Sequence, residues 1–213
     1  RRLTKPTHRE TTMLLDTILG RGFDPQAIIA GLIAITIALT VHEFAHAYRA
    51  DQAGDPTARS MGRVTLNPLA HYDPIGSTMI LLFGFGWGKA VPINPFRFRN
   101  PRRDQIMVSF WGPLSNLIVA AIIAIPLRLG LGGAYEGMLF IILQVQVYLA
   151  LFNLIPVPPL DGSHILSGLL PVPQARRLDA IYGQYGMFLL IGAFVVAGRV
   201  LPLIAGLLLS ILL

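Results

Sequence analysis

The sequence has no cysteine, and only 13% of its 213 residues are charged. Without thiols the chain can form neither disulfides nor thiolate metal sites, so any metal must be held by histidine, aspartate or glutamate. Soluble domains are about 25% charged, whereas this chain is 54% hydrophobic. We therefore expect an integral membrane protein surrounded by a lipid bilayer.

Positive charge exceeds negative charge, with 17 Lys and Arg residues against 11 Asp and Glu residues. In a membrane protein such an excess reports topology more often than nucleic-acid binding, so we expect no nucleic-acid partner. If the first span runs from outside to inside, more than half of the basic residues lie on the cytoplasmic side, as the positive-inside rule requires. The basic residues near the N-terminus, such as Arg9, conflict with this orientation.

Four long apolar regions predict the membrane-spanning helices, namely residues 27–48, 106–127, 138–158 and 181–213. The first would extend about 33 Å as a helix, enough to cross a hydrocarbon core of about 30 Å. Gly198, Arg199 and Pro202 interrupt the last region, which we interpret as two helices that meet near Arg199. The prediction is an all-α polytopic membrane protein with about five transmembrane helices.

The segment between the first two spans differs in kind, because prolines recur throughout residues 49–105. Proline at that spacing forbids a long helix and favours extended or turn conformations. Residues 77–87 are apolar but cover half a span, which predicts a re-entrant or surface segment. Residues 89–99, "KAVPINPFRFR", predict a short strand or a membrane-associated β-hairpin. Irregular backbone at membrane depth is tolerated where protein or a water-filled cavity covers it, so this segment indicates a site.

The stretch "HEFAH" places His42, Glu43 and His46 directly after an uncharged run, residues 27–41. On a helix His42 and His46 share a face and can bind one cation through neutral imidazoles. Glu43 can serve as a general base, which is the arrangement that H-E-x-x-H indicates. The alternative is two structural histidines and a paired glutamate, but ionisable groups inside membranes are functional by default.

A catalytic zinc site usually has three protein ligands, so a third is expected from elsewhere in the chain. The stretch "FNLIPVPPLDGSH" ends the third span, and its prolines break the helix just before Asp161. Asp161 is the candidate ligand, and His164 is its competitor because imidazole is the commonest metal ligand. Asp-Gly is also a common turn pair, and an ordinary loop turn would be the preferred interpretation if "HEFAH" were absent.

Three motifs in this order resemble the site-2 protease family of intramembrane zinc metalloproteases: "HEFAH" at 42–46, "GPLSN" at 112–116 and "NLIPVPPLDG" at 153–162. The resemblance implies that one Zn²⁺ ion is bound by His42, His46 and Asp161, and that Glu43 is the catalytic acid and base. It also assigns Asn116 and Asn153 to polar positions that support the active site or substrate. Helix-to-helix hydrogen bonding is nearly as good an interpretation of both asparagines.

The resemblance also divides the chain into a polar and interfacial N-terminal segment, residues 1–26, a membrane core, residues 27–170, and C-terminal transmembrane helices, residues 171–213. Within the first segment we expect an amphipathic interfacial helix at residues 13–23 rather than a signal peptide. We expect a compact prokaryotic-type member with no extra soluble domain, located in the cell membrane with its active site towards the cytoplasm.

The expected substrate is a membrane protein with a transmembrane helix, which must unwind before a hydrolase can reach its peptide bonds. Extended backbone in hydrocarbon costs several kcal/mol per unpaired group, so we expect residues 89–99 to pair with the substrate as an edge strand. The alternative function is a non-proteolytic metal-binding or ion-transport protein of the membrane. An ion carrier would show internal repeats and polar groups spread over several spans, and it would not need Glu43.

Overall fold

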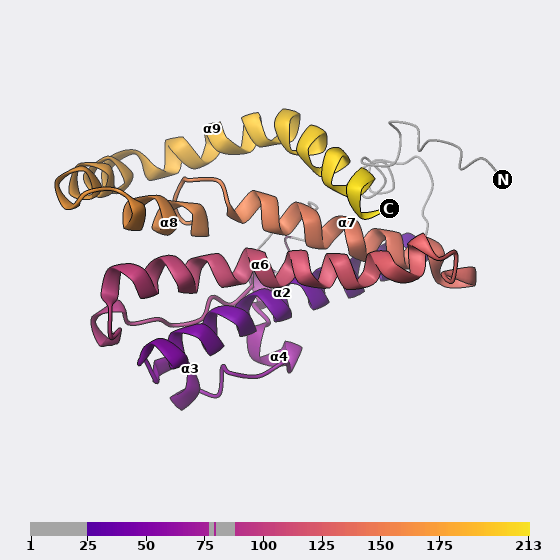
Figure 1. The fold of residues 1–213 in the computed structure, drawn as a ribbon, viewed down its shortest axis with the longest axis horizontal. Helices are drawn as coiled ribbons and strands as arrows, with labels where there is room; N and C mark the ends of the chain where they lie inside the picture. The colour runs from indigo at the N-terminus through magenta and orange to yellow at the C-terminus, as the bar shows by residue number, and fades with distance from the viewer. Residues whose placement is uncertain (1–24, 77–78, 80–87) are drawn as a thin grey trace.

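The computed structural model describes residues 25–76, 79 and 88–213. Within those residues the chain is built from helices and irregular segments (Figure 1). The long helices are α2 (Pro25–Ala53), α6 (Pro101–Arg128), α7 (Glu136–Asn153) and α9 (Val172–Leu212), and the shorter elements are α3 (Thr57–Ser60), α4 (Pro68–His71), η2 (Pro95–Arg97), η3 (Gly133–Tyr135) and α8 (Asp161–Leu169). The all-α prediction is confirmed for this part of the chain.

Four stretches in the described residues are long and apolar enough to cross a membrane, namely Ile28–Ala53, Pro101–Arg128, Gly133–Asn153 and Val172–Leu212. The count of about five spans is therefore wrong by one, because α9 continues through Arg199 and has Pro202 in its interior. Apolar helices tolerate proline where neighbouring helices or local adjustment satisfy the freed backbone carbonyl. The helix is curved and runs above α8 and α7 (Figure 1).

Small residues bring α2 and α6 close together. Along α2 the buried positions recur every four residues, as Ala30, Ala34, Ala38, His42, His46 and Ala50. Along α6 the matching buried positions are Val108, Gly112, Asn116, Ala120 and Ala124. Positions four apart lie on one face of a helix, and small side chains let two membrane helices approach closely. This interface carries both histidines of "HEFAH" into the interior.

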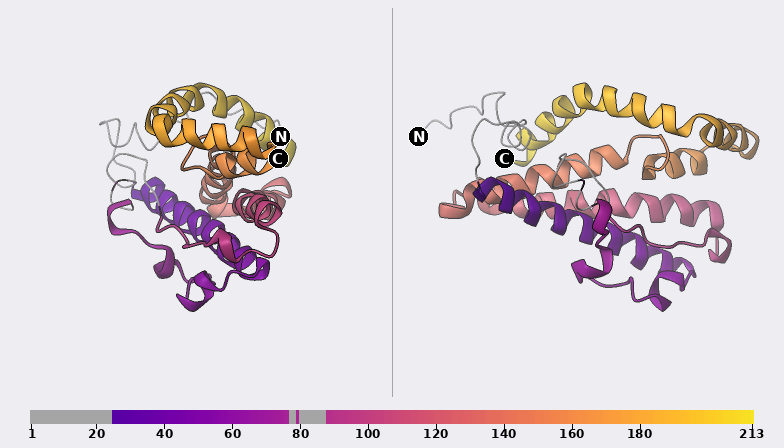
Figure 2. Two further views of the ribbon diagram at one scale, coloured as in Figure 1. Left: turned by 90° about the vertical axis from the view of Figure 1, so that its left-hand side faces the viewer. Right: turned by 180° about the vertical axis from the view of Figure 1, so that it is seen from behind.

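Helices α6 and α7 lie between α2 on one side and α9 on the other (Figure 2). Ala120 and Ala124 of α6, Leu143 and Val147 of α7 and Ala205 of α9 form one buried apolar cluster. The C-terminal third of α9 therefore packs on the ends of α6 and α7 that lie away from His42 and His46. This packing leaves the opposite end of the bundle for the polar residues of the candidate site.

The connection between α2 and α6 corrects one prediction. Residues 88–94 are extended but belong to no strand, and η2 follows them, so the β-hairpin at residues 89–99 is wrong. The physical reason is that side chains, rather than a second strand, bind the backbone here, and Pro92 has no N–H to offer a ladder. The re-entrant segment predicted at residues 77–87 lies almost wholly outside the described residues.

Candidate metal centre

His42 and His46 are brought together by the period of helix α2. They lie one turn apart, their rings meet edge to face with centroids 4.6 Å apart, and both side chains are buried beneath α6. The Nε2 atoms of the two rings are 3.0 Å apart. The spacing read from "HEFAH" therefore gives the shared face that the sequence predicts.

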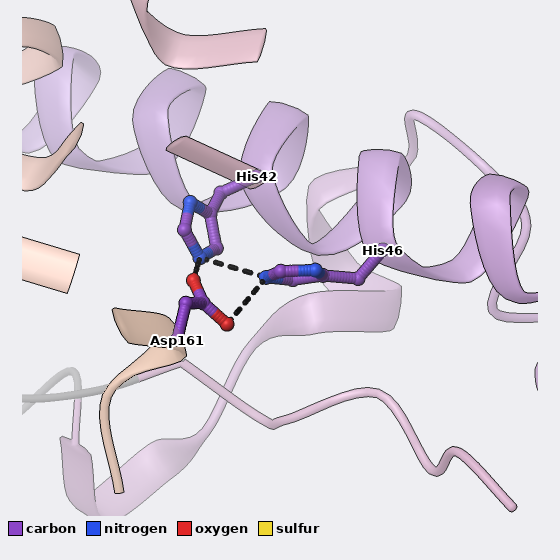
Figure 3. Close-up of side chains that lie close together, drawn as sticks. All are labelled: His42, His46 and Asp161. Carbon is purple, nitrogen blue, oxygen red and sulfur yellow. Dashed lines mark hydrogen bonds and ion pairs between the residues drawn. The ribbon is translucent and has the colours of Figure 1, made fainter. Parts of the chain in front are cut away.

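Asp161 reaches the same point from the other end of the chain, as Figure 3 shows. It is the first residue of α8, and its Oδ2 and Oδ1 atoms lie 3.1 Å from His42 Nε2 and 3.3 Å from His46 Nε2. Gly162 makes this approach possible, because a Cβ there would come closer than 3.0 Å to the carbonyl oxygens of Leu154 and Ile155. The Asp-Gly pair thus starts a helix packed on the end of α7, and the interpretation as an ordinary turn is wrong.

The hydrogen bonds fix the tautomer that each imidazole has in its neutral form. His46 Nδ1 lies 2.8 Å from the carbonyl oxygen of Val108, which can accept a hydrogen bond but not donate one. His42 Nδ1 lies 2.8 Å from Asn116 Oδ1, which is also an acceptor. Each neutral ring therefore carries its proton on Nδ1 and presents a bare lone pair at Nε2.

A divalent cation fits this arrangement. Two bare Nε2 atoms at 3.0 Å repel one another unless a positive charge lies between them. Among the described residues, Asp161 Oδ2 is buried without a hydrogen-bond partner. An ionised carboxylate whose oxygens lie 3.1 and 3.3 Å from these two nitrogens would add to the repulsion. His42, His46 and Asp161 form a group with metal-ligand geometry, and two imidazoles with one carboxylate suit zinc.

Gly112, the glycine of "GPLSN", lies directly against the two rings. A Cβ at this position would come closer than 3.0 Å to His46 Nε2, His46 Cε1 and His42 Cε1. The motif therefore contributes to the site through the absence of a side chain at Gly112 as well as through the hydrogen bond of Asn116. Apart from the resemblance, nothing in the sequence indicated this contact, because glycine is frequent in membrane helices.

Glu43 is half-buried and points its carboxylate at the connecting segment. Its Oε2 atom accepts a hydrogen bond of 2.8 Å from the backbone N–H of Val91. Glu43 follows His42 and therefore lies about 100° further round the helix, outside the group of three side chains that face one another. Glu43 is therefore not a member of the group that could hold a cation.

Two buried side chains hold the segment that contains Val91. The Arg63 guanidinium donates to the carbonyl oxygens of Lys89 and Ala90, and Asp55 Oδ2 accepts from the N–H of Asn94 over 2.6 Å. Burial opposes the charge on Asp55, but hydrogen bonds from Asn94 and Thr57 hold its pKa below the usual value. The sequence did not identify Arg63 or Asp55, because nothing local shows that they bind backbone more than 25 residues away.

The two predicted asparagines have different surroundings. Asn116 is fully buried, and its Nδ2 donates to the carbonyl oxygen of Ala38 and to Gln146 Oε1 in addition to the bond from His42. Asn153 instead donates to the carbonyl oxygen of Leu149 in its own helix. The structure therefore brings Asn116 to the metal centre, and it shows no bond between Asn153 and that centre within the described residues.

The remaining histidines lie apart from the group of three. His164 is exposed on α8. His71 is 2% exposed, and its ring contacts Arg63 and the carbonyl oxygen of Thr65. Since Thr65 accepts the proton of Nε2, the Nδ1 atom is left as an acceptor for Arg63. His71 is thus part of the support for the connecting segment.

The fold and this group define a membrane-spanning helical bundle with a group of side chains that could hold a metal ion. Known proteins resemble the chain in sequence. A family model described as peptidase family M50 matches residues 131–193. A Bacillus subtilis (strain 168) protein named "Putative zinc metalloprotease YwhC" is 38% identical over 174 residues, which cover 77% of this chain and 79% of the relative. The chain belongs to peptidase family M50, the site-2 protease family.

More distant relatives are longer than this chain. "Putative zinc metalloprotease Rip2" of Mycolicibacterium smegmatis is 32% identical over 179 residues, which cover 77% of this chain and 64% of the relative. The Rip2 protein of Mycobacterium tuberculosis (strain H37Rv) is 30% identical over 177 residues, with 78% and 66% covered. The comparison with solved structures found no match.

Proposed function

We propose that this chain is an intramembrane zinc metalloendopeptidase that hydrolyses peptide bonds within or near the transmembrane segments of membrane-anchored proteins. The observation that carries the proposal is the convergence of two unprotonated imidazole nitrogens and one carboxylate, with Glu43 next to His42. Membership in peptidase family M50 supports it. A protein that only held or carried a cation would have no use for Glu43.

In this proposal His42, His46 and Asp161 would hold one zinc ion, as the three protein ligands of a catalytic site do. When bound, the ion would supply a Lewis acid for the peptide carbonyl and would make water a stronger acid. Glu43 accepts a proton from the attacking water and delivers it to the leaving amine. The N–H of Val91 holds the carboxylate of Glu43 while this transfer takes place.

The extended segment at residues 88–94 is the proposed binding edge for an unwound substrate. The backbone N–H of Ile93 makes no hydrogen bond with the described part of the chain. A substrate strand could accept from this group and so satisfy part of its own backbone. Because alternate residues of an extended segment point their N–H groups to the same side, Ile93 would share this edge with Val91, which binds Glu43, and the edge would deliver a peptide bond to the catalytic carboxylate.

We further propose that the site faces the cytoplasmic side of a prokaryotic cell membrane. The apolar helices and the family make the chain an integral membrane protein. Exposed arginines gather around the start of α6, at the end of the bundle that contains the site, as Arg97, Arg99, Arg102 and Arg103. Basic residues in short loops favour the cytoplasmic side.

A direct test incubates the purified chain, reconstituted in vesicles with zinc, with a panel of single-span membrane proteins, and maps the fragments by mass spectrometry. We expect cleavage within or beside a transmembrane segment of at least one protein, and its loss on adding a zinc chelator. If the protein binds zinc stoichiometrically but produces no chelator-sensitive fragment, the metal-binding or transport alternative is favoured.

A further inference from the structure

Gln146 is a polar residue in the apolar interior of α7. It is fully buried and lies between the buried residues Leu143 and Val147. Its Oε1 atom accepts a hydrogen bond of 2.6 Å from Asn116 Nδ2. Its Nε2 atom is buried with no hydrogen-bond partner in the part of the chain that the structure describes. The carbonyl oxygen of this amide therefore has a hydrogen-bond partner, and its amino group has none among the described residues.

The hydrogen bond at Gln146 Oε1 belongs to a chain of hydrogen bonds that ends at the metal centre. Asn116 Nδ2 has two hydrogens, and they go to Ala38 O at 3.0 Å and to Gln146 Oε1 at 2.6 Å. With Nδ2 committed to these acceptors, Asn116 Oδ1 faces His42 Nδ1 at 2.8 Å. The oxygen accepts the proton of Nδ1, and His42 Nε2 keeps its lone pair towards His46 and Asp161.

We propose that Gln146 is a positioning residue for the metal centre, which fixes the orientation of the Asn116 amide and thereby the tautomer of His42. The inference rests on the proposed zinc site. Without the acceptor at Gln146, one Nδ2 hydrogen of Asn116 is unpaired in a buried site, and the amide can rotate to present Nδ2 to His42. An Nδ2 donor facing Nδ1 favours the tautomer with its proton on Nε2, which cannot bind zinc.

A purely structural role does not explain Gln146. An unsatisfied buried donor destabilises the folded state, and an unbranched apolar side chain of similar length would fill the same volume. Methionine at this position removes that donor but leaves one Nδ2 hydrogen of Asn116 unpaired, so the two costs offset and the variant should fold about as well as wild type. The positioning role thus predicts weaker zinc binding without a matching loss of stability.

The test compares Gln146→Met with Gln144→Met in the full chain, purified in detergent. Gln144 lies on the same helix, is half-buried and makes no hydrogen bond within the described residues, so it controls for the substitution itself. Zinc affinity is measured by competition with a chromogenic chelator, and thermal unfolding is followed without added zinc and with increasing zinc. Gln146→Glu retains an acceptor oxygen and serves as the conservative rescue.

We expect Gln146→Met to bind zinc about 10- to 100-fold more weakly than wild type, the usual effect of losing a partner of a metal-bound histidine. Its unfolding temperature without zinc should be close to that of wild type, and both Gln144→Met and Gln146→Glu should bind zinc as wild type does. Equal zinc affinities for Gln146→Met and Gln144→Met would overturn the inference. A parallel fall in zinc affinity and zinc-free stability would also overturn it, in favour of a structural role. If wild type itself binds no zinc, the proposed function fails together with the inference, and that outcome is distinct from the other two.

Discussion

Asp161 places both of its carboxylate oxygens within 3.3 Å of an imidazole nitrogen of α2. A carboxylate offsets part of the charge of a divalent cation in a low-dielectric interior, which an imidazole cannot do. The competing ligand His164 lies three residues further along α8 and is exposed. Three residues turn a helix by about 300°, so His164 leaves α8 about 60° round from Asp161, on the side exposed to solvent. The geometry therefore favours Asp161.

We predict that Asp161→Ala loses zinc while His164→Ala and His71→Ala retain it. The loss should exceed the ~10–100-fold effect of removing an outer partner, because a ligand itself is removed. Metal content of the three purified variants, measured in parallel, checks this. Zinc retained by Asp161→Ala and lost by His164→Ala would mean that the site has three histidine ligands.

Gly112 yields a second prediction at the scale of one atom. In Gly112→Ala the new methyl group meets both imidazoles closer than 3.0 Å. Overpacking costs about 1–3 kcal/mol, which corresponds to roughly 5- to 150-fold weaker zinc binding if the strain falls on the site. Chelator competition measures this change. Gly192→Ala is the matched control, since nothing lies within 4 Å of a Cβ at that position of α9, and equal affinities in the two variants would contradict the predicted contact.

Among the elements, the extended segment at residues 88–94 differs most from its prediction. The sequence showed that proline prevents a helix here, and the structure agrees. It could not show which groups satisfy the backbone, because the partners Arg63 and Asp55 are distant in sequence. A strand was the default prediction for an extended segment, whereas side chains of the preceding turns occupy the places that a neighbouring strand would take.

The proposed substrate edge predicts that a backbone donor matters more than a side chain. Ile93→Pro removes the N–H of Ile93, and Ile93→Ala keeps it while reducing the packing of Ile93 on the cluster around Phe98. Phe96 is 96% exposed, so Phe96→Ala should matter little. We expect Ile93→Pro to reduce the cleavage rate at matched expression far more than the two alanine variants do. Similar rates in all three would argue that substrate does not pair with this segment.

Helix α9 shows a limit of sequence periodicity. Gly198 and Pro202 weaken a helix in water and Arg199 puts a charge into an apolar run, so together they predicted a break. The helix continues because α7 packs against it, with Leu143 and Val147 of α7 in one buried cluster with Ala205 of α9. Tertiary packing and the apolar surroundings outweigh the local preference, and neither is visible in the sequence of α9 alone.

At the scale of the whole molecule, the sequence predicts well the features that follow from helical periodicity and from the length of apolar runs. The period of α2 was enough to place His42 and His46 on one face, and the length of the apolar runs was enough to find the spans. The approach of Asp161, Asn116 and Gly112 to that face depends on how α6, α7 and α8 pack, which spacing does not determine. The resemblance to a family supplied the prediction for Asn116 and strengthened the one for Asp161, while the contact of Gly112 was not predicted.

The proposed function requires a metal centre and, beside it, the carboxylate of Glu43 as the group that accepts and delivers protons. Glutamine at position 43 keeps the shape of the side chain but cannot accept a proton. His42, His46 and Asp161 are unchanged in Glu43→Gln, so the variant should bind zinc in the same ratio as wild type. Loss of general acid-base catalysis should lower cleavage by at least ~100-fold.

The most direct test is therefore one measurement on Glu43→Gln and wild type side by side, in which zinc content and cleavage of the same membrane-protein substrate are determined on the same preparations. The account predicts equal zinc content, with cleavage present in wild type and nearly absent in the variant. Cleavage by Glu43→Gln at close to the wild-type rate, with zinc still bound, would contradict the assignment of Glu43 and with it the proposed mechanism.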